Sequence, residues 1–242
     1  MSMKIDIVKR PDVNLSEREE MYSVFSRYYV NVEHSRFETD FNEKNWVIQL
    51  RNQDLCIVGF STLQIYEHSG SSGSAAIIYS GDTIIDRAYR LNGDLAGAFG
   101  HLLLRVIEEH PSMPVYWLLT SKGARTYRFL PVFFKTFFPV FDQQTPENIK
   151  ALIDEVATEK FEADYSPETQ VVSHRGQRDW LCASEHDPSL LERDDPHIRF
   201  FLERNPGYTV GDELVCITEM SEDNLNARAR RVIKHTEVQW RE

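Results

Sequence analysis

The chain has 242 residues, of which 41% are hydrophobic and 27% charged, as is typical of a globular protein with a substantial core. Its net charge of −11 argues against nucleic-acid binding, because such binding depends on neutralising phosphates. The N-terminus lacks the apolar region of a signal peptide, and the most apolar run, at 129–141, is too short to span a bilayer. Three cysteines in apolar runs predict reduced core thiols rather than disulfides. We therefore expect a cytoplasmic protein that binds neither nucleic acid nor membranes.

The first third of the chain carries the patterns of four strands and one helix. Ser16 followed by Glu19 predicts a capping box at the start of the helix. Alternating or β-branched residues predict the strands, and a run of Ser and Gly predicts a loop. The predicted segments are a strand at 4–9, a helix from Ser16, strands at 46–50 and 55–66, a loop at 68–74 and a strand at 75–86.

Gly81 lies inside the last of these strands, where glycine commonly marks a bulge or a close approach to the backbone. After a turn at Gly93, apolar residues recur with a helical period up to Val106, and Pro114 then precedes a second buried strand. Strand, helix and strand in this order predict a crossover unit with two parallel strands. A further helix is expected at 123–130, ended or kinked by Pro131.

The last hundred residues have weaker patterns. Helices are predicted from Glu147, from Asp195–Pro196 and from Ser221, and a strand is predicted over the apolar segment between the last two. No repeat or long linker divides the chain. We therefore expect a single domain over 1–242, with a helical insertion at 142–165 and C-terminal strands and helices at 166–242 that complete the sheet.

The order of elements over residues 4–138 resembles the GNAT superfamily, the N-acyltransferases that use acyl-CoA. The resemblance implies an α+β fold with a central mixed sheet that is mostly antiparallel. One parallel pair of strands is splayed at a bulge, and helices cover both faces. Residues 1–140 would then form the acyl-CoA-binding core.

The family signature, Arg/Gln-x-x-Gly-x-Gly/Ala, opens the helix after the bulged strand and binds the pyrophosphate of CoA. The corresponding residues here are Arg90, Leu91, Asn92, Gly93, Asp94 and Leu95. Arg90 and Gly93 match the signature, whereas Leu95 does not. Asp94 adds a negative charge at a helix N-terminus, which otherwise favours anions. Lys122 and Arg125, from a local basic cluster, are expected to join Arg90 in binding the anionic cosubstrate.

The resemblance also implies acyl transfer from a thioester to an amine. Backbone N–H groups near Thr83, Ile84 and Ile85 would bind the pantetheine arm and the oxyanion. The amine must lose a proton, and Asp82 and Tyr79 are the nearest candidates for the base, unless a chain of waters serves instead. The structural alternative for Asp82 is a polar residue that satisfies the bulged backbone.

Two positions after the second parallel strand complete the comparison. GNAT enzymes often carry an asparagine at the end of that strand and a tyrosine seven residues later, which protonates the departing CoA thiolate. Thr120 and Tyr127 occupy these positions. The resemblance thus implies that Tyr127 is the general acid, and its structural alternative is a core or surface aromatic.

Three functions remain open. The first is an N-acyltransferase that uses acetyl-CoA or acyl-CoA as cosubstrate and a small-molecule amine as acceptor. The second takes the acyl group from acyl carrier protein, as autoinducer synthases and N-acyl amino acid synthases do, and 129–141 would then either hold a lipid tail or form core. The third is a non-catalytic ligand-binding module. No metal is expected, since the histidines and aspartates at 186–197 lack ligand spacing. The sequence is compatible with a homodimer.

Overall fold

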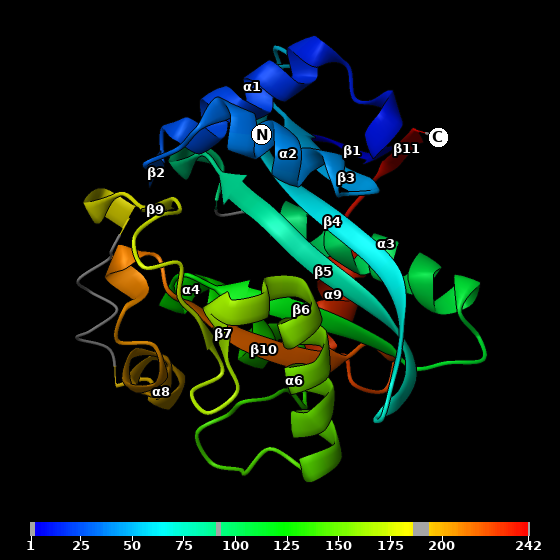
Figure 1. The fold of residues 1–242 in the computed structure, drawn as a ribbon. Helices are drawn as coiled ribbons and strands as arrows, with labels where there is room; N and C mark the ends of the chain where they lie inside the picture. The colour runs from blue at the N-terminus through cyan, green and yellow to red at the C-terminus, as the bar shows by residue number, and fades with distance from the viewer. Residues whose placement is uncertain (1–2, 91–92, 186–193, 242) are drawn as a thin grey trace.

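The computed structural model of the protein describes residues 3–90, 93–185 and 194–241 (Figure 1). Within them a mixed sheet has the strand order β11-β1-β3-β4-β5-β6-β10-β8-β7. All neighbours pair antiparallel except β5 with β6 and β11 with β1. The strands are β1 (Lys4–Lys9), β3 (Trp46–Arg51), β4 (Ile57–Gly70), β5 (Gly73–Ile85), β6 (Val115–Ser121), β7 (Tyr165–Ser166), β8 (Val171–Val172), β10 (Glu213–Glu219) and β11 (Gln239–Arg241). The predicted α+β sheet is therefore confirmed.

Helices cover both faces of this sheet. One face is covered by α1 (Leu15–Ser26), α2 (His34–Asn42) and α6 (Glu147–Phe161), and the other by α3 (Asp94–Glu109), α4 (Ala124–Tyr127), α5 (Phe129–Phe133), α8 (Pro196–Arg204) and α9 (Ala227–His235). A separate small sheet pairs β2 (Tyr29–Val30) with β9 (Trp180–Leu181). In Figure 1, α6 lies in front of the sheet and α3 and α9 lie behind it. Among the described helices, none is long and apolar enough to cross a membrane.

The middle of the sheet is buried on both faces, as the apolar runs of its strands predict. In β5, Ala76 and Ile78 pack toward α3, whereas Ala75 and Ile77 pack toward α6. This double burial is characteristic of a central parallel strand. The helix and strand that follow β5 form the predicted crossover unit with parallel β5 and β6.

Several predicted boundaries are wrong for local reasons. The capping box of α1 uses Asn14 and Glu17 rather than Ser16 and Glu19, because the Asn14 side chain accepts the Glu17 N–H at 3.0 Å. Strands β4 and β5 extend through most of the predicted loop and leave a tight turn at 71–72. Cys56, predicted to be a core residue, is exposed.

Two helix ends also differ from the predictions. Residues 123–130 form two short helices, and Pro131 lies in the first turn of α5, where no intrahelical N–H bond is lost. The final helix begins after Asn226 instead of Ser221, because the Asn226 side chain accepts the N–H groups of Arg228 and Ala229. The predicted helix near Asp195 is confirmed as α8.

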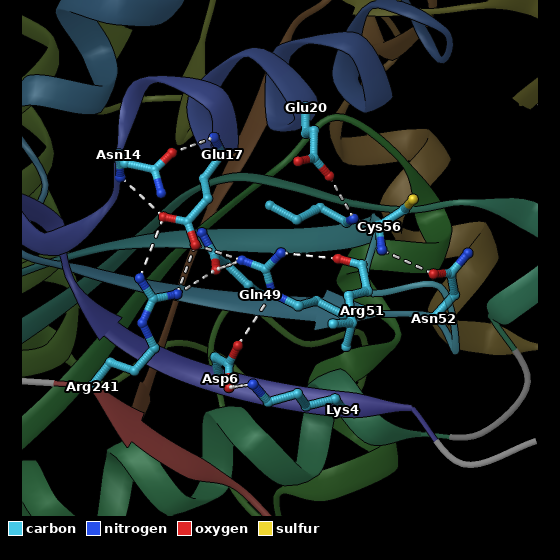
Figure 2. A network of polar contacts seen from close by, with 12 residues as sticks. Lys4, Asp6, Asn14, Glu17, Glu20, Gln49, Arg51, Asn52, Cys56 and Arg241 are labelled. Atoms are coloured by element: carbon cyan, nitrogen blue, oxygen red, sulfur yellow. Dashed lines mark hydrogen bonds and ion pairs between the residues drawn. The ribbon is translucent and has the colours of Figure 1, made fainter.

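A partly buried polar network attaches the C-terminal strand β11 to the edge of the sheet (Figure 2). Arg241 and Arg51 each donate to Glu17 Oε1, at 2.7 and 2.6 Å. Arg51 also donates to Asp6 Oδ2 at 3.2 Å and to Gln49 Oε1 at 2.7 Å. The network thus joins α1, β1, β3 and β11, which are distant in sequence.

Replacing Arg241 with Met is expected to lower the free energy of unfolding by about 1 kcal/mol, because Glu17 loses one of two cations at a partly exposed site. Burial alone would raise the pKa of Glu17, but the hydrogen bonds from Arg241 and the Asn14 backbone, with the charges of Arg241 and Arg51, together outweigh it and lower this pKa. A carboxyl whose pKa is lower in the folded than in the unfolded state stabilises the fold at pH values above its unfolded pKa of about 4.3. This stabilisation is lost as pH falls through the folded-state pKa.

Urea unfolding at neutral and acidic pH measures this effect. The difference between wild type and Arg241→Met should shrink in acid. Arg230→Met removes an exposed guanidinium from α9 and is the matched control, expected to be close to neutral. A difference that stays constant with pH would show that the Glu17 pair is not its source.

Candidate functional site

The parallel strands β5 and β6 separate in the middle of the sheet. They pair over residues 76–80 and 115–119 and then diverge. At this point Thr62 of β4 lies opposite two residues of β5, Gly81 and Asp82. This is a β-bulge, which bends the strand locally, and the pairing of β5 with β6 ends just before it. The predicted splay at Gly81 is therefore confirmed.

The space above the bulge at Gly81 is occupied by a side chain from another element, so a larger residue here would have to displace it. A Cβ atom on Gly81 would lie 2.6 Å from Cε of Lys44 and 2.7 Å from Oγ1 of Thr62. Lys44 follows α2, and its Nζ donates to the Asp40 carbonyl at 2.7 Å. The close approach that the interior glycine predicted is thus made by a lysine of the same chain.

The gap between the diverging strands opens into a cavity of about 610 Å³ that reaches both faces of the sheet. We call its part on the α2 and α6 side the polar chamber, lined by Lys44, Tyr79, Asp82, Lys122, Lys160 and Asp179. We call its part on the α3 side the apolar chamber, lined by Phe99, Trp117, Phe133, Phe134, Leu225 and Ile233. A substrate in the gap therefore meets charge on one side and hydrocarbon on the other.

Asp82 is the titratable residue of the bulge itself. Its burial, followed by the charge of Asp179, raises the pKa of the carboxyl to about 7, against the opposing effects of Lys122 and Lys44. At neutral pH it is therefore divided between the ionised and protonated forms. A carboxyl of this kind, at the wall of a cavity, is suited to accept a proton from a substrate.

Tyr79, the other predicted base, has a different character. Burial and the charge of Glu213 raise the pKa of its phenol, so the phenol stays protonated at neutral pH. Two ammonium groups lie over its ring, that of Lys160 at 4.2 Å and that of Lys44 at 5.6 Å from the centroid. The Tyr79 hydroxyl can donate a hydrogen bond in the polar chamber, whereas Asp82 suits the role of base.

Lys122 lies in the polar chamber, whereas the resemblance implied a role in CoA binding. Its Nζ is 2.6 Å from Asp179 Oδ2 and 3.6 Å from Glu213 Oε1. Burial alone would lower the pKa of Lys122, but these two carboxylates outweigh it and raise the pKa. Despite burial, Lys122 together with His174 lowers the pKa of Glu213 to about 2. The positive charge of Lys122 is therefore balanced by two carboxylates of the protein itself.

Arg90, which is expected at the pyrophosphate, shares one acidic partner with its neighbour Arg87. Arg87 Nη2 and Arg90 Nη1 are each 2.6 Å from the carboxylate of Glu185, and Arg90 Nε donates to the Ile85 carbonyl at 2.7 Å. Nη2 of Arg90 is buried and has no hydrogen-bond partner among the described residues. Arg125 is exposed and also lines the cavity. One donor of Arg90 is thus left for an anion.

The helix that follows the bulged strand begins as the signature predicts. Gly93 is the N-cap of α3 with φ of +73°, a conformation that favours glycine, and Asp94 is the first helical residue. Leu95 is buried and lines the cavity. Leu91 and Asn92 lie outside the described residues. The N-terminus of α3 therefore adjoins the cavity, with hydrocarbon at the position where the family has a small residue.

Backbone donors on β5 face the gap. The Asp86 N–H bonds the Val58 carbonyl of β4 at 2.8 Å, and Ile85 lies opposite Gly59. Because hydrogen-bonded pairs alternate along an antiparallel ladder, the N–H of Ile84 points toward β4, and those of Thr83 and Ile85 point toward the gap. Of the three residues predicted to bind the pantetheine arm, two therefore have N–H groups that point into the gap.

Tyr127 is not brought to the gap. Its ring is fully buried, 5.8 Å from the ring of Phe201 in α8, and its hydroxyl donates to the Pro139 carbonyl at 3.0 Å. Among the described residues that line the cavity, Tyr127 does not appear. The single turn of α4 directs this side chain toward α8 instead of the bulge. Its role as general acid stays a prediction without support from its position.

Several residues of the site carry no signal in the sequence. Lys44, Lys160, Asp179, Glu185 and Glu213 come from loops, helix ends and a late strand, far from Gly81 in the chain. No motif or spacing marked them. They meet only because the sheet and the small β2–β9 pair bring their segments together.

Comparison with protein-family models gives no match, and comparison with curated proteins gives none. Among solved structures, the chain is similar to a probable N-acyltransferase of Enterococcus faecalis, with 13% identity and a TM-score of 0.43 over 57% of this chain and 33% of that one. It is also similar to Arabidopsis thaliana NAA60 in complex with a bisubstrate analogue, with 14% identity and a TM-score of 0.38 over 59% of this chain and 92% of that one. A third is the GNAT family N-acetyltransferase YhbS of Escherichia coli in complex with CoA, with 10% identity and a TM-score of 0.39 over 53% of this chain and 69% of that one.

The matched region spans only about a third of the Enterococcus faecalis chain. The features of this chain itself define its fold. Its strand order, its bulge at Gly81 and its separated parallel pair form a GNAT-like fold of divergent sequence.

Proposed function

We propose that this GNAT-like chain is an N-acyltransferase that moves an acyl group from a CoA thioester to the amine of a small molecule in the cytoplasm. The observation that carries the proposal is the position of Asp82. This carboxyl lines the polar chamber at the bulge, beside the gap-facing N–H groups of Thr83 and Ile85. Its pKa of about 7 suits a general base.

The reaction follows from this arrangement. The thioester lies in the gap, where the N–H of Thr83 or Ile85 donates to its carbonyl oxygen as negative charge develops there. The amine approaches from the polar chamber, and Asp82 takes the proton that it loses as the C–N bond forms. The C–S bond then breaks, and the sulfur leaves with its electron pair and takes a proton from water, while Asp82 releases its proton to the solvent. The products are an amide and the free thiol.

The mouth of the cavity fits the anionic end of the donor. The N-terminus of α3, the unpartnered Nη2 of Arg90 and the rim residue Arg125 would face a pyrophosphate there. Glu185 opposes this fit, because its carboxylate already pairs with Arg87 and Arg90. That pairing favours the second donor, acyl carrier protein, whose phosphopantetheine presents a single phosphate to the mouth.

Calorimetric titration with CoA and acetyl-CoA tests the donor. We expect micromolar binding and about tenfold weaker binding for Arg90→Gln, because one charge-assisted bond to phosphate is lost. Arg36→Gln, a substitution on α2 outside the cavity lining, is the matched control. Absence of heat with either ligand would overturn the CoA donor and leave the carrier protein or a non-catalytic role.

A further inference from the structure

We infer that the apolar chamber holds the chain of a medium-length or long acyl group, so that the donor carries more than an acetyl group. This inference rests on the proposed function, because the thioester must lie in the gap beside Gly81. It adds the chemical class of the acyl group, which the gap alone does not determine.

The walls of the apolar chamber offer hydrocarbon to an occupant. The rings of Phe99 and Trp117 lie 4.6 Å apart, and those of Trp117 and Phe134 lie 5.8 Å apart. The indole N–H of Trp117 is satisfied by Ser80 Oγ at 2.9 Å, so this ring can present carbon to the cavity without leaving a donor unpaired. An alkyl chain gains from such a surface, whereas a polar ligand would lose its hydrogen bonds to water.

The chamber is continuous with the place of the thioester. Ser80 and Leu119 form the last parallel pair before the strands separate, and both line the same cavity as Gly81 and Thr83. A thioester carbonyl in the gap has two substituents, and the pantetheine arm must lead to the mouth near Arg90. The acyl chain then continues into either chamber. The charged groups of the polar chamber disfavour hydrocarbon, which leaves the apolar chamber.

Helix α9 closes the chamber on the side away from the sheet. It lies against α3 at Gly97 and Gly100, where a Cβ atom would overlap the side chains of Thr236 and Ile233. Because these glycines permit close approach, Ala229 and Ile233 of α9 line the cavity directly. An acetyl group would leave most of this lining without contacts, whereas a longer chain would fill it.

Binding of S-acyl pantetheines tests the chamber without the nucleotide. We expect the affinity of acetyl-, hexanoyl- and decanoyl-pantetheine to rise about fourfold for each added methylene until the chain fills the chamber. The same series of acyl-CoA thioesters should show the same dependence. Affinities that stay flat from acetyl to decanoyl, or no binding by any member of either series, would overturn the inference.

Two opposite variants locate the effect. Ala229→Leu fills the chamber and should shift the preference to shorter chains. Phe133→Ala enlarges the chamber and should shift the preference to longer chains. The matched control is Phe141→Ala, an exposed phenylalanine outside the lining, which should keep the wild-type dependence. Thermal unfolding identifies folded variants, and an unchanged preference in both folded variants would overturn the inference.

Failure of this inference differs from failure of the proposed function. If affinity rises with chain length but no acyl group is transferred to any amine, the proposed enzyme activity is wrong and the chamber is still an acyl-binding site. If acetyl groups are transferred but affinity does not depend on chain length, the proposed enzyme activity stands and the acyl-binding role of the chamber is wrong.

Discussion

Replacing Asp82 with Asn is expected to lower kcat about 10²- to 10⁴-fold, the usual contribution of a general base. The amide cannot take the proton of the attacking amine, although it keeps the size of the carboxyl. In the wild type, activity should rise with pH through about 7, because the base acts in its ionised form. The Asn variant should lose this rise. Thiol release from an acyl-CoA, followed from pH 5.5 to 8.5 with a fixed amine, measures both effects.

Stability separates this effect from misfolding. The pKa of Asp82 is raised by burial above its unfolded value, so its ionised form destabilises the folded state as pH rises. The Asn variant should therefore have a higher Tm than wild type at neutral pH while it loses activity. Asp86→Asn, a matched change at the end of the same strand and outside the cavity lining, should leave the pH profile unchanged. Wild-type kcat and pH dependence in Asp82→Asn would remove Asp82 from the mechanism.

Replacing Lys122 with Met is expected to lower the free energy of unfolding by about 3–5 kcal/mol, the typical cost of removing one partner from a buried ion pair. The side chains of Asp179 and Glu213 are 13% and 11% exposed, so water cannot replace the lost ammonium. The pair of Lys150 and Asp154 on α6, whose side chains are 33% and 28% exposed, offers the more solvated control. Lys150→Met should cost less than about 1 kcal/mol.

The pH dependence of this loss identifies its source. The pKa of Glu213 is about 2 in the folded state, below its pKa of about 4.3 in the unfolded state. The ionised Glu213 therefore stabilises the fold above a pH of about 4.3, and this stabilisation is lost as pH falls. The pKa of Lys122 is raised in the folded state, so its charge stabilises the fold fully at pH values below the unfolded pKa of about 10.4. This stabilisation is lost only as pH rises further. Urea unfolding should thus show the full difference at pH 7 and a smaller one at pH 3. Equal losses at both values would contradict the ion-pair explanation.

Local patterns were sufficient to predict the part of the fold that forms the gap. An interior glycine in a strand, a glycine turn and an apolar helix followed by a buried strand predicted the bulge at Gly81 and the parallel pair of β5 and β6. Each of these signals comes from neighbouring residues. Strand β11 was not predicted, because its pairing with β1 depends on a network between Arg241 and Glu17 across most of the chain.

The candidate site was only partly predictable for the same reason. Asp82 was identified because it directly follows Gly81, whereas its raised pKa depends on burial in the folded chain and then on Asp179, nearly a hundred residues away. Spacing along the chain placed Tyr127 near the thioester, but the direction of its side chain depends on how α4 packs against α8. Likewise, nothing in the sequence signature indicated that Glu185 would pair with its arginine.

The most direct test of the proposed activity is a transfer experiment with product identification. The protein is mixed with acetyl-CoA or decanoyl-CoA and a panel of small primary amines, thiol release is followed, and the products are analysed by mass spectrometry. We expect one N-acyl amine for each thiol released, a higher rate with decanoyl-CoA, and loss of product with Asp82→Asn. No amine-dependent thiol release from either donor would contradict a CoA-dependent N-acyltransferase.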